Sequence, residues 1–156
     1  MPPLDDVKPE GSGNLLPEID LPKVKKSQLD FDLEFFDSIL RRAPDYIDVM
    51  RCQGELLSRK GLHERALEID RRLAAALPHD AVVQYNLACS LSCNNLAADA
   101  VAALRRAFER GYDDFEHLDL DHDLELLRTD PRYVALLEEF RPRPNPPRRA
   151  KKSRRK

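Results

Sequence analysis

Apolar residues recur along the middle of the chain with the spacing of one helix face. Between residues 31 and 110 they fall mostly three to five or seven to eight positions apart, and no stretch alternates apolar and polar residues as a strand would. A helix-breaking residue follows each apolar segment: Pro44, Gly61, Pro78, Asn95 or Gly111. The pattern therefore predicts five helices and no sheet, with the helices at 31–42, 48–60, 63–77, 81–93 and 96–110.

The helix-closing prolines Pro44 and Pro78 are 34 residues apart, and a polar turn follows each of them. A period of 34 residues is typical of helix–turn–helix repeats. We therefore divide this part of the chain into two units, 47–80 and 81–114.

Small residues recur at matching positions of the two units. Gly54 matches Ala88 on the first helix of each unit, and Ala66 matches Ala100 on the second helix. A larger side chain at these positions would push the two helix axes apart. The spacing therefore predicts that the paired helices touch there.

These positions resemble those of the tetratricopeptide repeat (TPR) family. The segment Tyr85-Asn-Leu-Ala-Cys is similar to the signature of its first helix, and Ala100, Leu104 and Ala107 are similar to the pattern of its second helix. Residues 111–140 look like the element that closes short bacterial arrays. The resemblance implies an all-α, TPR-like α-solenoid of antiparallel helix pairs over 31–140, capped by 31–43 and 124–140 because a solenoid end exposes apolar surface.

Charge divides the chain into three parts. Residues 1–30 carry four basic and six acidic residues, 31–140 carry 13 basic and 22 acidic, and 141–156 carry nine basic and no acidic residue. Five of the twelve prolines lie in the first part and four in the last, so we expect both ends to be disordered. The formal net charge of -2 therefore describes neither the acidic body nor the basic tail.

The groove that first helices line in TPR proteins is the best candidate site, because the resemblance implies that it binds extended peptides or partner helices. We expect its exposed face to carry Asp48, Arg59, Ser92 and six candidate partner-binding residues: Arg51, Glu55, Val82, Tyr85, Asn86 and Cys89. Tyr85 is of particular interest, since an exposed aromatic is a frequent contact in protein interfaces. The leading hypothesis is a non-catalytic scaffold or adaptor for a protein or peptide partner. A second copy of the chain could also cover an uncapped end.

The basic tail supports an alternative, an adaptor that binds nucleic acid or the ribosome. Its cations suit phosphate contacts and lack aromatic residues for base stacking, so such binding would tolerate many sequences and weaken with salt. A solubilising role and attraction to the acidic body are other interpretations. The candidate residues are Arg148, Arg149, Lys151, Lys152, Arg154, Arg155 and Lys156.

A third hypothesis is a metal-responsive protein that uses the acidic segment 113–125. Asp119, Asp121 and Asp123 have the first spacings of a calcium loop, but Leu124 stands where such loops need Gly. Cys89 and Cys93 lie one helical turn apart without a C-x-x-C motif, which favours apolar packing over a metal or redox site. We therefore assign no specific metal-binding residues.

We predict that the chain is not an enzyme and needs no cofactor, because no catalytic motif is present. The sequence also lacks a signal peptide and a membrane span, so we expect a cytoplasmic protein.

Overall fold

A computed structural model describes residues 26–142, and residues 1–25 and 143–156 lie outside the described part. Helices with short turns make up the described chain, which contains no strand. The all-α prediction is therefore confirmed. The elements are α1 (Gln28–Arg42), α2 (Ile47–Arg59), α3 (His63–Ala76), α4 (Ala81–Cys93), α5 (Ala97–Glu109), α6 (Phe115–Leu120), the 3₁₀ helix η1 (His122–Leu127) and α7 (Pro131–Phe140).

Three of the turns between helices have the same geometry. Gly61, Asn95 and Gly111 have φ angles of 73°, 60° and 97°, in the left-handed region that ends helices. The residue after each one donates its backbone N–H to a carbonyl five positions earlier, as Leu96 does to Leu91 at 2.9 Å. Asn95 was predicted to end its helix for this reason, and the φ angle confirms it.

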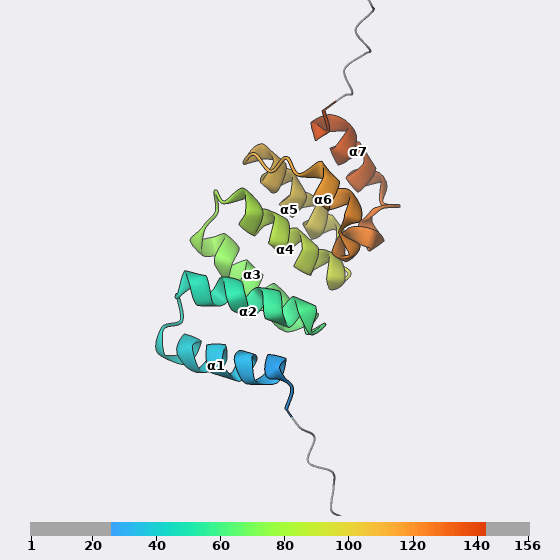
Figure 1. Cartoon of the computed structure of the whole chain (residues 1–156). Helices are drawn as coiled ribbons and strands as arrows, with labels where there is room; N and C mark the ends of the chain where they lie inside the picture. Colours follow the sequence, from blue (N-terminus) through green and yellow to red (C-terminus); the bar gives the residue numbers. More distant parts are fainter. Residues whose placement is uncertain (1–25, 143–156) are drawn as a thin grey trace, which may run out of the picture.

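Successive helices pack on one another from α1 to α5, so the described chain is a stack with its two ends far apart (Figure 1). α4 begins 34 residues after α2, and α5 begins 34 residues after α3. This arrangement confirms a solenoid-like fold built from antiparallel helix pairs.

The predicted close contacts are present. Ala66, Ala88 and Ala100 are at most 1% exposed. A Cβ atom placed on Gly54 would lie 3.5 Å from Ile69 Cγ2 of α3, so α2 and α3 approach closely at that point. Small residues at matching positions therefore set the spacing of the helices.

The C-terminal elements cover one end of the stack. Leu118 of α6 and Leu124 and Leu127 of η1 are fully buried in a core shared with α4 and α5. At the other end, α1 begins at Gln28, inside the segment predicted to be disordered. Ser27 caps this helix by accepting from the Asp30 N–H, while the Asp30 carboxylate accepts from the Ser27 N–H. The folded part is thus longer than predicted at this end; the predicted disorder of the rest of 1–30 and of the tail falls mostly outside the described residues.

Candidate binding groove

A hollow of about 610 Å³ lies along one face of the stack. α2 forms one wall, α4 and the adjoining part of α3 form the floor, and α6 with η1 forms the other wall. The side chains that line it are those of Arg51, Cys52, Glu55, Ser58, Arg59, Asp70, Leu73, Tyr85, Asn86, Cys89, His117, Asp121 and Asp123, together with the bare backbone of Gly54. We call this hollow the groove.

Five of the six predicted partner-binding residues line the groove, namely Arg51, Glu55, Tyr85, Asn86 and Cys89. Glu55 and Asn86 are exposed and have no hydrogen bond from their side chains within residues 26–142. Arg51 is half-buried and donates to Asp80 Oδ2 at 2.7 Å, so part of its charge is already compensated. Val82 is 49% exposed but is not part of the lining.

Asp80 ties the groove wall to the start of α4. One of its oxygens accepts from the N–H groups of Val82 and Val83 at 3.0 Å each, which caps the helix. The bond from Val83 contributes most to holding the pKa of Asp80 below its usual value, and the bond from Arg51 adds to this effect. The ion pair therefore fixes α2 to the turn between α3 and α4.

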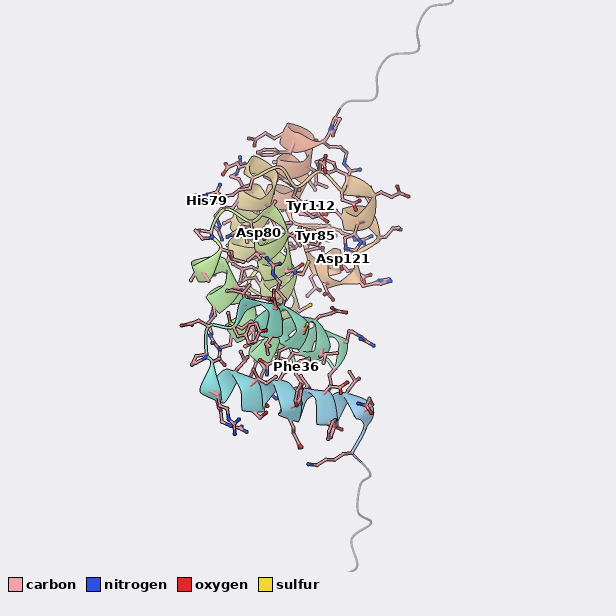
Figure 2. The ribbon with its side chains drawn as sticks, turned by 60° about the vertical axis from the view of Figure 1, so that its left-hand side comes forward. Phe36, His79, Asp80, Tyr85, Tyr112 and Asp121 are labelled. Carbon is pink, nitrogen blue, oxygen red and sulfur yellow. The ribbon has the colours of Figure 1, made fainter. Side chains whose placement is uncertain are left out.

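The prediction that Tyr85 is exposed is wrong, because Tyr85 is only 3% exposed. Its hydroxyl donates to Asp121 Oδ2 at 2.6 Å, and its ring stacks on Tyr112 at a centroid distance of 4.2 Å. Figure 2 shows Tyr85, Tyr112 and Asp121 close together. Burial is the main cause that raises the pKa of Tyr85. Tyr85 thus holds the C-terminal elements against α4 and offers a partner little surface.

Cys89 and Ser92 were also predicted to lie on the exposed face, and this is wrong because they are 8% and 0% exposed. Cys89 Sγ lies 3.4 Å from Asp121 Oδ2, and burial raises the pKa of its thiol. Burial and the nearby Asp123 raise the pKa of Cys93 to about 12. Neither thiol therefore has the lowered pKa of a reactive site. Cys52 is exposed in the groove.

Asp70 is a groove residue that the sequence did not reveal. It is 6% exposed, and its Oδ2 accepts from the Ser90 hydroxyl at 2.5 Å. A Cβ atom on Gly54 would lie 3.3 Å from Asp70 Oδ1, so this carboxylate packs close to the backbone of Gly54, and both residues line the groove. Burial raises the pKa of Asp70 more than the Ser90 hydrogen bond lowers it. The signal available in the sequence was that Asp70 stands 34 residues before Leu104, at a position where the second unit has a large apolar residue.

The acidic segment 113–125 does not form a calcium loop. Residues 115–120 are helical and residues 122–127 form η1. Asp119 pairs with Arg141, and Asp121 accepts from Tyr85. Across residues 26–142, no group of three or more His, Cys, Asp or Glu side chains is placed to hold a metal ion. The acids instead connect elements of the fold.

The predicted nucleic-acid-binding residues, from Arg148 to Lys156, lie outside the described residues. Arg141, where the tail begins, is described, and its guanidinium donates to the two Asp119 oxygens at 2.9 and 2.5 Å. The same guanidinium lies 5.5 Å from the centre of the Phe115 ring. The first residue of the basic tail is therefore held on α6. None of the helices in the described part is long and apolar enough to span a membrane.

Comparison with known proteins adds one relative. The chain is 34% identical over 91 residues to a chloroplastic protein of Arabidopsis thaliana. The alignment covers 56% of this chain but only 27% of that protein, so the chain spans about a quarter of the relative's length. No family model and no solved structure matches the chain.

Proposed function

We propose that this chain is a non-catalytic interaction module of the TPR type, an adaptor that binds an extended peptide or a partner helix in the groove. The observation that carries the proposal is the groove itself. It extends from α2 across α3 and α4 to α6 and η1, and it is lined by side chains, such as Glu55 and Asn86, that make no hydrogen bond within residues 26–142. Polar groups in a concave surface of this kind fix the orientation and register of a bound segment.

The helix arrangement supports the assignment to the TPR type. The 34-residue offset between the two helix pairs is the length of a TPR unit, and small residues occupy the matching contact positions. A solenoid presents the first helices of its units on one concave surface, where side chains from several units reach one ligand. The groove is formed in this way in part, because α2 and α4 are the first helices of the two pairs and both line it.

Selection of peptides from a random library, displayed on phage, tests the proposal. The full chain is the bait, and the affinity of each selected peptide is measured by fluorescence anisotropy. Asn86→Ala removes an exposed groove side chain, and we expect it to weaken binding about fivefold or more, as for a residue central to an interface. Asp99→Asn on α5 is the matched control, because Asp99 is exposed and outside the groove. Peptides that bind Asn86→Ala as tightly as the native chain, or no selected peptide at all, would contradict the proposal.

Nucleic-acid binding by the tail is the second candidate, and the nine basic residues without an acid from 141 to 156 favour it. Its test is retention of the full chain on single-stranded DNA at low salt. Replacement of the tail cations by Gln should abolish retention, and equal retention of the two proteins would rule this role out.

A further inference from the structure

The groove carries more negative than positive charge. Glu55, Asp70, Asp121 and Asp123 line it, against Arg51 and Arg59. Asp80, which is not part of the lining, is already paired with Arg51. The charge balance of the groove therefore favours a ligand with cationic side chains.

Among the described residues, the carboxylates of Asp70 and Asp121 accept hydrogen bonds only from neutral donors. His117 is an ionisable group near Asp121 that can become positively charged. Asp70 accepts from the Ser90 hydroxyl, and Asp121 accepts from the Tyr85 hydroxyl, the Cys89 thiol and a backbone N–H. Neutral donors complete the geometry of a carboxylate but leave its negative charge in place. His117 Nε2 lies 3.8 Å from Asp121 and adds charge only when it is protonated.

Of these two carboxylates, Asp70 gives the stronger indication of a cationic ligand, because it is only 6% exposed and still lines the groove. Its Oδ1 has no hydrogen-bond donor among the described residues and lies close to Gly54, which also lines the groove. A buried carboxylate without a counter-charge is costly, and a bound ammonium or guanidinium group would offset that cost. The long side chains of Lys and Arg can reach such a position from a backbone that lies in the groove.

The start of the tail is held on α6, which forms part of one wall of the groove. The Arg141–Asp119 pair holds the start of the tail on α6, and Asp119 is two residues from Asp121 of the groove wall, about 7 Å along the backbone. Residues 143–156 carry eight basic residues and no acid. Fourteen residues reach at most about 50 Å when extended, which is more than this separation.

We propose that the basic segment 143–156 of the same chain binds in the groove, with Lys and Arg side chains against Asp70, Asp121 and Asp123. This inference rests on the proposed function, because it takes the groove to be the peptide-binding site. The tail then acts as an internal competitor, which a partner has to displace. A segment tethered this closely has an effective concentration of the order of millimolar, so an intrinsic Kd of about 1 mM is enough for half occupancy.

Comparison of amide spectra tests the inference in the full chain. ¹H–¹⁵N spectra of the native chain are compared with those of a tail-neutral chain that carries Arg143→Gln, Arg148→Gln, Arg149→Gln, Lys151→Gln, Lys152→Gln, Arg154→Gln, Arg155→Gln and Lys156→Gln. At 0.1 M NaCl we expect shift differences at groove residues such as Glu55, Asn86 and Asp123. At 1 M NaCl, where charges are screened beyond about 3 Å, these differences should disappear.

A matched pair of double variants separates groove binding from general attraction to an acidic body. Glu55→Gln with Asp123→Asn should reduce the tail-dependent shifts at Asn86 at least twofold, because it removes two charges from the groove. Asp99→Asn with Glu109→Gln removes two exposed charges from α5 and should leave the shifts unchanged. Absent shifts, shifts of equal size on α5, or shifts that persist in the groove variant would overturn the inference.

Peptide affinity distinguishes failure of this inference from failure of the proposed function. If the tail competes, a peptide selected for the groove should bind the tail-neutral chain at least twofold more tightly than the native chain. Equal affinity together with absent shifts would overturn the inference and leave the groove as a peptide site. If no groove peptide binds either chain, the proposed function fails as well.

Discussion

The hydrogen bond between Tyr85 and Asp121 allows a quantitative test of how the groove wall is held. Tyr85→Phe keeps the ring that stacks on Tyr112 and removes only the hydroxyl, which donates to Asp121 at 2.6 Å. A hydrogen bond to a charged group contributes about 1.5–3 kcal/mol. The Asp121 side chain retains 15% exposure, so water can replace part of the lost bond. We therefore expect a loss of about 1.5–2 kcal/mol in the free energy of unfolding, at the lower end of that range.

Urea unfolding followed by circular dichroism measures this loss. With a slope of about 2 kcal/mol per molar, the midpoint should fall by about 1 M. Tyr46→Phe is the matched control, because Tyr46 is 50% exposed and its hydroxyl makes no hydrogen bond within the described residues. It should change the free energy of unfolding by less than about 0.5 kcal/mol.

A double-mutant cycle with Asp121→Asn assigns the loss to the pair. The coupling energy between the two positions should be about 1 kcal/mol or more, because each substitution alters the same hydrogen bond. A Tyr85→Phe protein as stable as the native one, or a coupling energy near zero, would refute the view that this bond fastens the C-terminal elements to α4.

Three further predictions concern other contacts of the fold. Gly54→Leu should lower the free energy of unfolding by about 1–3 kcal/mol, because its side chain would collide with α3; an unchanged urea midpoint would contradict the close approach of α2 and α3. Asp80→Ala should cost about 1–2 kcal/mol at pH 7 through the lost cap of α4. Since the pKa of Asp80 is lowered in the folded state, this contribution is present above about pH 4 and lost as the pH falls further; a difference between the two proteins that stays constant down to pH 2 would be the contrary result. A neutral maleimide should add once to the native chain, at the exposed Cys52, and three times in urea; two or more additions to the native chain, seen by intact mass, would show that Cys89 or Cys93 is accessible.

Local signals in the sequence predicted the helices well because their ends are set by local chemistry. Pro78 and Gly61 end helices through their own backbone restrictions, whatever the rest of the chain does. The boundary at the N-terminal side was less accurate. The capping box of Ser27 and Asp30 starts α1 earlier than the apolar pattern indicated, although its spacing was visible in the sequence.

The exposure of α4 could not be predicted from its apolar spacing alone. Its Tyr85 and Cys89 lie on the face where a first helix normally meets solvent, and α6 and η1 cover that face. One signal was available, since residues 81–93 contain no charged side chain, and a helix without a charged face is usually buried all round. Tyr85 and Cys89 therefore line the groove with little exposed surface, whereas Glu55 and Asn86 are its exposed side chains.

Peptide binding in the groove is tested by mapping a selected peptide on the labelled chain. The peptide is titrated into the ¹⁵N-labelled full chain, and the amide shift changes are mapped on the helices. We expect the largest changes at Glu55, Asn86 and Asp123, around the groove, and little change on the exposed side of α5. Changes that centre on α5, or on Val134 and the outer side of α7, would place the binding site elsewhere and contradict peptide binding in the groove.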